Sequence, residues 1–195
     1  MSIGEIAGVI AGVLALTAFV PYIIAILRGS TRPNRATWFI WTVVGLLLAT
    51  SYYSSGAHDT LWVPVAYVAG PLVVAVLSIK FGEGGWTWLD RLCLFGAAAS
   101  APLWWLSGSP LIALVINLLI DALGALPTIR KSYYNPQGED RTAWALGLAG
   151  ATVNLFAIEA WSFEIAAYPV YMFVANATIA ALVLVPRKQK NIGPS

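Results

Sequence analysis

Long apolar runs follow one another along the chain, and short polar segments separate them. Each run approaches the roughly 20 residues that a helix needs to cross a hydrocarbon core of about 30 Å. The runs are continuous rather than alternating, which favours helices over the strands of a membrane barrel. The pattern therefore predicts seven membrane-spanning helices, at residues 6–27, 36–53, 61–79, 92–106, 111–129, 143–158 and 165–185.

The composition predicts a surface that faces lipid. Of the 195 residues, 59% are hydrophobic and 10% are charged, whereas soluble domains carry about 25% charged residues. So few charges cannot cover a folded chain of this size in water, which excludes a soluble enzyme domain. The single cysteine, Cys93, excludes a disulfide scaffold. The first partner that the sequence predicts is thus the lipid bilayer.

The basic residues all fall in predicted loops on one side of the membrane. These loops and the C-terminal tail contain all 11 Lys and Arg residues: Arg28, Arg32, Arg35, Lys80, Arg91, Arg130, Lys131, Arg141, Arg187, Lys188 and Lys190. Under the positive-inside rule, the N-terminus lies outside and the C-terminus is cytoplasmic, as in a multi-pass protein of the cell (inner) membrane. The net charge of +2 reflects this asymmetry between loops, so we infer no nucleic-acid partner from it.

The first and last thirds of the chain resemble each other. A segment from Pro21 to Arg35 and Trp38 recurs, 106 residues later, from Pro127 to Arg141 and Trp144. Val63-Pro64-Val65 corresponds to Tyr168-Pro169-Val170 at an offset of 105 residues. Because an odd helix separates the two triplets, they run in the same direction, as parallel repeats. The predicted units are a triple-helix repeat at 1–80, a linker loop and helix at 81–108, a second repeat at 109–186 and a cytoplasmic tail at 187–195.

Two triple-helix repeats joined by a linker helix resemble the SWEET sugar transporters and the wider PQ-loop family. The prolines of the family's Pro-Gln pairs match Pro21 and Pro127, but Tyr22 and Thr128 stand where glutamine would be. This departure leaves the substrate open among sugars, nucleosides and amino-acid-like solutes. The chain is also similar to bacterial nicotinamide riboside transporters, which share the helix plan and a Trp-x-x-Trp element, here Trp38 to Trp41.

Four prolines are candidate hinges. Pro21 and Pro127 lie near the cytoplasmic ends of their predicted helices, and Pro64 and Pro169 lie near the outer ends of theirs. Proline removes a helical hydrogen bond and kinks the chain, and membrane helices tolerate it where neighbours re-satisfy the freed carbonyl. The resemblance implies that the repeats rock about these prolines. A static bend that improves packing is the alternative.

Asp121 is the only acidic residue deep within a predicted span, and no Lys or Arg lies in any span to neutralise it. A charge in hydrocarbon is costly unless it is paired or hydrated, so an intramembrane acid is a candidate proton carrier. Asn117, Asn154 and Asn176 are candidate substrate-binding residues, with Trp41 as a stacking platform. The resemblance implies that Asn176 contacts the substrate. The alternative is that these polar groups only hold the helices together.

Small residues at Gly4, Gly8 and Gly12 predict a smooth helix face. Such a face lets another helix approach closely, within the bundle or, as the alternative, in a homo-oligomer. The tryptophans near predicted span ends predict an interfacial belt: Trp38, Trp86, Trp88 and Trp144 inside, and Trp62, Trp104, Trp105 and Trp161 outside.

The sequence therefore predicts an all-α integral membrane protein that moves a small polar solute by alternating access, with proton coupling through Asp121. It contains no metal-ligand motif, nucleophile–base pair or nucleotide-binding fingerprint, so we expect no enzyme, cofactor or metal. The alternative is a membrane receptor or sorting protein on the same fold, which would bind a partner without transport.

Overall fold

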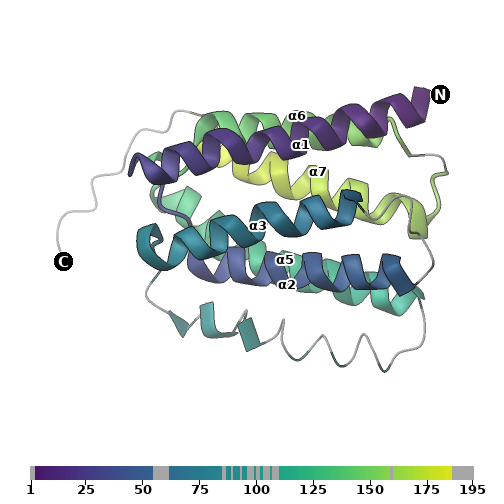
Figure 1. Cartoon of the computed structure of the whole chain (residues 1–195), viewed down its shortest axis with the longest axis horizontal. Coiled ribbons are helices and arrows are strands. Elements are labelled where there is room, and N and C mark those ends of the chain that lie inside the picture. The colour runs from purple at the N-terminus through teal and green to yellow at the C-terminus, as the bar shows by residue number, and fades with distance from the viewer. Residues whose placement is uncertain are drawn as a thin grey trace.

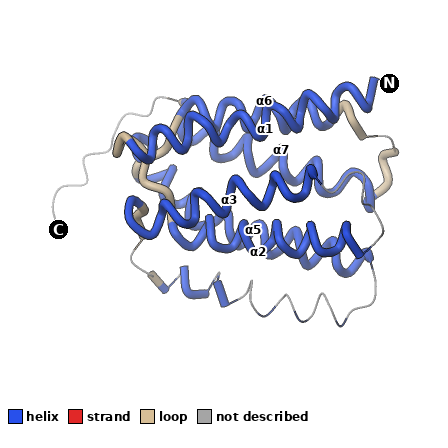
Figure 2. Tube along the Cα trace, in the orientation of Figure 1, coloured by secondary structure: helices blue, strands red, loops and turns tan. Residues whose placement is uncertain are grey.

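The computed structural model describes residues 3–54, 62–84, 110–158 and 160–185, together with ten positions between 87 and 106. Every regular element within these residues is helical, which confirms the predicted all-α class (Figures 1 and 2). The elements are α1 (Ile3–Leu27), α2 (Arg35–Ser54), α3 (Trp62–Phe81), α5 (Pro110–Tyr134), a short 3₁₀ helix η1 (Pro136–Gly138), α6 (Arg141–Leu155) and α7 (Phe163–Leu184). The predicted linker helix at 92–106 falls largely outside the described residues.

Two helix ends show how the local sequence sets the boundaries. Gly29 adopts a positive φ of 74°, and the amides of Gly29 and Ser30 donate to the carbonyls of Ile26 and Ala25, each at 3.0 Å. This is a Schellman motif, in which glycine takes the left-handed conformation that ends α1. At the start of α6, the Asp140 side chain caps the helix by accepting from the Ala143 amide at 2.7 Å.

Two predicted boundaries differ from the structure. Helix α5 continues to Tyr134, five residues beyond the predicted end at 129, because Lys131 and Ser132 are buried against the bundle rather than lying in a solvated loop. Helix α6 ends at Leu155, before the predicted end at 158, where the amides of Phe156 and Ala157 bond the carbonyls three residues back and tighten the chain into turns.

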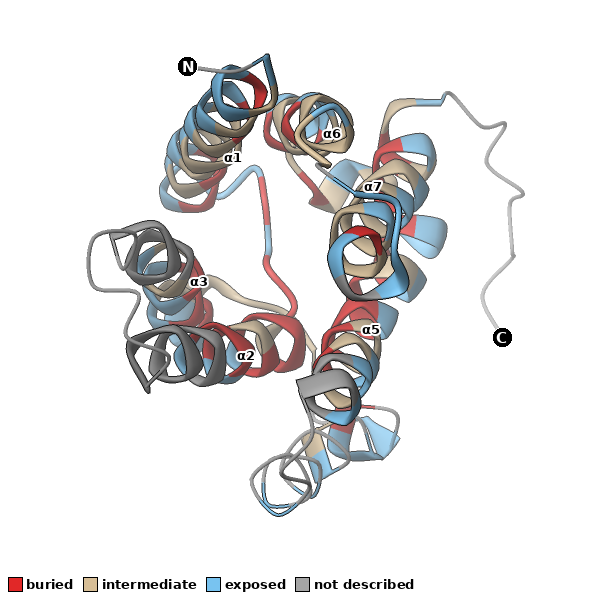
Figure 3. Ribbon diagram, turned by 90° about the vertical axis from the view of Figure 1, so that its right-hand side faces the viewer, coloured by how far each residue is buried: buried red, intermediate tan, exposed pale blue. Residues whose placement is uncertain are grey.

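The helices form a closed ring (Figure 3). Helix α3 packs between α1 and α2, and α7 packs between α5 and α6. The ring closes where α1 packs on α6 and α2 packs on α5. Exchanging α1 with α5, α2 with α6 and α3 with α7 leaves this list of neighbours unchanged.

The outer surface of the ring is apolar. Large exposed side chains include Ile6 and Val13 on α1, Val76 on α3, Leu119 on α5 and Val174 on α7. In the described part of the chain, two helices are long and apolar enough to cross a membrane by length and composition, Ile3–Leu27 and Ile165–Leu184. Only 22% and 17% of their apolar windows are buried, whereas the core helix of a soluble protein is mostly buried.

The loops that contain the described basic residues gather at one end of the ring. The Arg32 amide donates to Gly138 O at 3.1 Å, joining the α1–α2 and α5–α6 loops. Arg35 Nε donates to Ser78 O at 2.9 Å, at the C-terminal end of α3. Arg141 donates to Leu184 O at 2.7 Å, at the end of α7. We call this the basic end of the ring.

Gly124 lies where α5 packs on α2, and a methyl group has no room there. A Cβ atom at Gly124 would lie 2.7 Å from Cγ2 of the buried Ile40. We expect Gly124→Ala to destabilise the fold, because overpacking costs about 1–3 kcal/mol and alanine adds only about 1 kcal/mol of helix propensity. The measurement is the apparent melting temperature of the purified protein in detergent.

Gly12→Ala is the matched control, since a Cβ atom there would meet nothing within 4 Å. We expect this variant to melt at or above the wild-type temperature, because it gains helix propensity without a clash. Two variants that melt at the same temperature would contradict the close approach of α2 and α5.

Candidate functional site

A central cavity of about 400 Å³ lies inside the ring, and all six helices line it. Its volume is within the range of small-molecule sites. The wall formed by α1 and α6 is built from small residues, among them Gly8, Gly12, Gly147 and Gly150. The α1–α6 contact is close at Gly150, where a Cβ atom would lie 3.2 Å from the backbone of α1. The small residues of α1 thus serve packing within the bundle and also leave space for the cavity.

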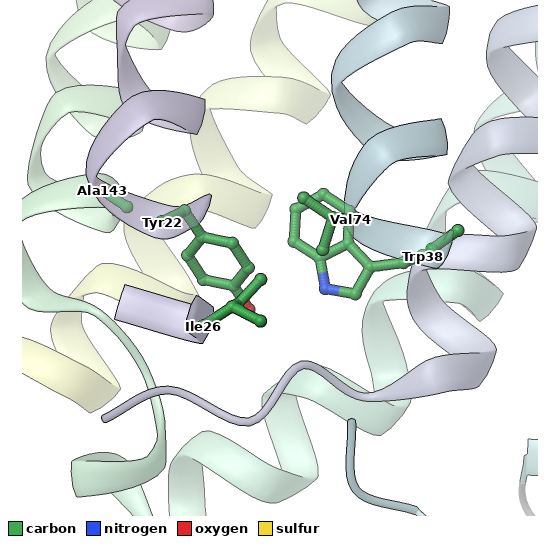
Figure 4. Close-up of a cluster of buried hydrophobic side chains, with 6 residues drawn as sticks. Tyr22, Ile26, Trp38, Val74 and Ala143 are labelled. Atoms are coloured by element: carbon green, nitrogen blue, oxygen red, sulfur yellow. The ribbon is translucent and has the colours of Figure 1, made fainter. Parts of the chain in front are cut away.

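Four aromatic side chains lie together at the basic end of the cavity, and we call them the aromatic floor: Tyr22, Trp38, Trp41 and Trp144. Each ring contacts two others, so the four form a cycle. The Trp38 centroid lies 5.1 Å from those of Tyr22 and Trp41, and the Trp144 centroid lies 6.4 Å from those of Tyr22 and Trp41. Beside the floor, Ile26 and Val74 are fully buried (Figure 4). This packing closes the cavity toward the basic end.

The prediction that Trp38 and Trp144 belong to an interfacial belt is wrong. Their side chains are only 5% and 7% exposed, because the first turns of α2 and α6 direct them into the ring. The Trp144 indole also has a buried acceptor in Glu139. A position near a span end cannot distinguish a belt tryptophan from one that faces the interior, since both lie at the same depth.

Glu139 is the hub of the hydrogen bonds beneath the floor, and only 4% of it is exposed. Its Oε2 accepts from the Tyr22 hydroxyl and from Trp144 Nε1, both at 2.8 Å. Its Oε1 pairs with Lys131 Nζ at 2.7 Å. Lys131 also donates to the carbonyl oxygens of Arg32 and Gly138. This cluster was not predicted, because the sequence places Lys131 among the basic loop residues and carries no signal that Glu139 lies buried beneath the ring.

The residues that follow Pro21 and Pro127 both form hydrogen bonds across the ring. Tyr22, after Pro21, bonds Glu139 at the start of the α6 segment. Thr128, after Pro127, donates to Thr37 Oγ1 of α2 at 2.8 Å, and both threonines are fully buried. Each bond joins one helix triplet to the other at the basic end.

Asp121 lines the cavity and is buried, with 8% of its surface exposed. Its Oδ2 accepts a hydrogen bond from the Tyr171 hydroxyl of α7 at 2.6 Å. Trp41 Nε1 donates to the Asp121 backbone carbonyl at 3.3 Å, which places the indole beside the carboxyl. Tyr171 is a second residue that the sequence analysis missed, although a tyrosine in the middle of an apolar span is a usable signal.

The cavity carries no basic side chain: among the described residues that line it, none is Lys, Arg or His. Asp121 is the only acidic residue among them. No group of three or more His, Cys, Asp or Glu in the described part of the chain is placed to hold a metal ion.

Two of the three predicted asparagines line the cavity. Asn154 of α6 and Asn176 of α7 are among its lining residues. Asn176 Nδ2 donates to Met172 O at 2.9 Å, and its Oδ1 lies beside Gly147. Asn117 is buried but does not line the cavity, and its Oδ1 has no hydrogen-bond partner. Helical spacing placed Asn117 on the face of Asp121, but the cavity ends before the preceding turn.

The candidate hinge prolines occupy different parts of their helices. Pro21, Pro127 and Pro169 lie inside α1, α5 and α7. Pro64 lies in the first turn of α3 as the structure describes it, and its side chain is outside the described residues. Pro71, inside α3, lines the cavity.

Comparisons with known proteins add no family to these observations. The chain matches no protein-family model, no curated protein and no solved structure. The resemblance to SWEET and PQ-loop transporters stays a prediction from the sequence.

Glu139→Gln keeps the size of the side chain and removes the charge that Lys131 faces. Breaking a buried ion pair costs about 3–5 kcal/mol, because the other charge is left unpaired. Lys131 keeps Glu83 Oε1 at 3.6 Å and two carbonyl acceptors, so we expect a loss at the low end of this range, about 3 kcal/mol in the free energy of unfolding, measured by denaturant titration in detergent.

The double variant Glu139→Gln/Lys131→Met removes the stranded charge, and we expect it to recover most of the loss in a double-mutant cycle. Asp140→Asn is the matched control, since asparagine caps a helix as well as aspartate does. Losses that simply add in the double variant would refute the ion pair as the source of stability.

Proposed function

We propose that this chain is a membrane transporter of seven helices that moves a small polar solute by alternating access, with proton coupling through Asp121. Its two parallel triple-helix units, 1–80 and 109–186, would rock about the central cavity. The N-terminus would lie outside the cell (inner) membrane and the C-terminus in the cytoplasm.

The observation that carries this proposal is the content of the cavity. Four residues singled out from the sequence come from four different helices and line one space: Trp41 of α2, Asp121 of α5, Asn154 of α6 and Asn176 of α7. A pocket with a few converging polar groups and mostly apolar walls is typical of small-molecule sites. Static interhelical hydrogen bonding would not need a cavity of about 400 Å³ between them.

The walls of the cavity support the two-unit architecture. Positions related by the offset of 106 residues line the cavity in pairs, as Ala15 with Asp121 and Trp38 with Trp144 do. The pairing of neighbouring helices is also unchanged when the two triplets are exchanged. An axis along the membrane normal between the units would produce both features.

The membrane placement rests on two surfaces. The outer faces of the helices present large apolar side chains, such as Val13, Val76 and Val174, which lipid can solvate. The described basic residues lie at a single end of the ring, where Arg32, Arg35 and Arg141 join its loops. This distribution fits a cytoplasmic location for that end.

The hydrogen bonds that join the two units at the basic end indicate what must move. The cavity is closed there by the aromatic floor, and the bonds of Tyr22 to Glu139 and of Thr128 to Thr37 cross between the units. Opening of the cavity toward the cytoplasm requires both of these hydrogen bonds to break. Each follows a proline inside a helix, Pro21 or Pro127, where the hydrogen-bond ladder is already interrupted.

Transport can be tested by solute flux in proteoliposomes with an imposed pH gradient, using sugars, nucleosides, amino acids and organic cations. We expect one class to accumulate with the gradient. Asp121→Asn should abolish this pH dependence, because the amide keeps the shape but cannot release a proton. Asp140→Asn, which removes an acid outside the cavity, should retain it. Absence of flux with every class, together with pH-dependent binding of a protein partner, would instead support the receptor alternative.

Gly147 tests the role of Asn176. A Cβ atom at Gly147 would lie 2.8 Å from Asn176 Oδ1, so Gly147→Ala must displace that amide. We expect the KM for the transported solute to rise about tenfold, because the loss of one polar contact costs about 1.4 kcal/mol. The melting temperature should stay at the wild-type value. Gly12→Ala, in the same wall, adds the same methyl group to the cavity without meeting any atom within 4 Å, and it controls for the lost volume. An unchanged KM in Gly147→Ala would exclude Asn176 from the binding site.

A further inference from the structure

The charge inside the cavity is unbalanced. Asp121 is its only charged lining residue, and no described Lys, Arg or His lines it. The hydroxyl of Tyr171 supplies the carboxyl with one hydrogen bond but no positive charge. A carboxylate buried among apolar walls is strongly disfavoured unless a proton or a cation neutralises it. Ionised Asp121 therefore requires a positive charge at a defined position on the cavity wall.

We infer that the transported solute is a small organic monocation, and that it and a proton compete for the carboxyl of Asp121. This inference rests on the proposed transport function and names its substrate class. Anionic solutes such as phosphates and carboxylates would find no described basic partner in the cavity and would be repelled by Asp121.

The aromatic residues beside Asp121 favour the same class. The Trp41 indole bonds the backbone of Asp121, so a cation held by the carboxyl also contacts this ring. Trp38 and Trp144 pack on Trp41, with centroids at 5.1 and 6.4 Å, and extend the aromatic surface. Aromatic faces attract organic cations within about 6 Å, and the attraction grows when water is excluded.

Competition with a proton follows from the groups that face Asp121. Helix α5 packs on α2, α7 and η1. From α7, Tyr171 donates to the carboxyl and Tyr168 lines the same cavity. Helix α2 contributes Trp41, which does not titrate, and Tyr22 of α1 is engaged by Glu139. No described cation stands near enough to replace the proton, so the carboxyl alternates between a proton and the solute.

This arrangement predicts an exchange in which charge balances. One proton leaves the carboxyl on the side where one monocation binds. On the opposite side a proton replaces the monocation as it leaves, and the return step carries that proton back across the membrane. Transport is then an electroneutral one-for-one antiport. A pH gradient drives it, and the membrane potential alone does not.

Binding is tested with a pair of molecules that share a shape and differ in charge, choline and its neutral carbon analogue 3,3-dimethyl-1-butanol. The fluorescence of Trp38, Trp41 and Trp144, which line the cavity, reports occupancy in detergent. We expect choline to bind at least tenfold more tightly than its analogue. The affinity for choline should fall by about tenfold for each unit by which the pH is lowered in the acidic range. This slope is what competition between the cation and one proton requires. Tetraethylammonium serves as a second cation, and glucose as a neutral rival.

The matched variants separate this inference from the transport function. Asp121→Asn should remove the preference for choline over its analogue, and Asp140→Asn should keep it. In proteoliposomes, choline uptake should alkalinise the lumen, because one proton leaves for each choline that enters, and it should not respond to a potassium-diffusion potential. Equal binding of choline and its analogue, or flux of glucose without flux of either cation, would overturn the cation inference and leave transport standing. No flux of any solute would overturn the proposed function itself.

Discussion

The fold is held at its basic end by one buried carboxylate. Glu139 accepts hydrogen bonds from Tyr22 of α1 and Trp144 of α6 and pairs with Lys131 of α5. Three helices and the loop between two of them thus meet at one side chain. A carboxylate can be buried only when such partners replace water, and here they come from both helix triplets. The position of the aromatic floor follows from this, because two of its four rings are fixed by bonds to Glu139.

Asp121 presents the opposite case. It is about as buried as Glu139, but its carboxyl accepts from the Tyr171 hydroxyl, and no described cation pairs with it. The two acids therefore divide the described polar interior into an ion-paired cluster that joins the units and a carboxyl without a cationic partner that lines the cavity. A structural acid gains stability from complete pairing, whereas a binding site requires that one pairing be left for the solute. The contrast explains why only one of these acids is a candidate for binding.

The sequence predicted most of the helices because apolar length is a strong signal, and it placed Trp41, Asp121, Asn154 and Asn176 at positions that the structure brings to one cavity. It could not predict Glu139, because spacing does not show that a loop charge is folded back under the bundle. Asn117 shows a further limit, since helical periodicity gives the face of a helix but not the depth at which a cavity ends. Trp38 and Trp144 were misplaced for a related reason. The sequence indicates how far along a helix each tryptophan lies, but it does not indicate toward which neighbour the side chain points.

The two triplets share a plan but differ in the residues that line the cavity, and the differences follow a pattern. Ala15 stands opposite Asp121, Pro71 opposite Asn176 and Gly147 opposite Trp41, all of them lining residues. In these three pairs a polar or aromatic group in one unit corresponds to a small or rigid residue in the other, whereas Trp38 and Trp144 are tryptophan in both units. Two carboxyls facing each other across the cavity would hold two charges or share one proton. In the proposed transporter, a single carboxyl against alanine would leave room for a solute and set its charge at one, so the differences between the two units, rather than their symmetry, would define the site.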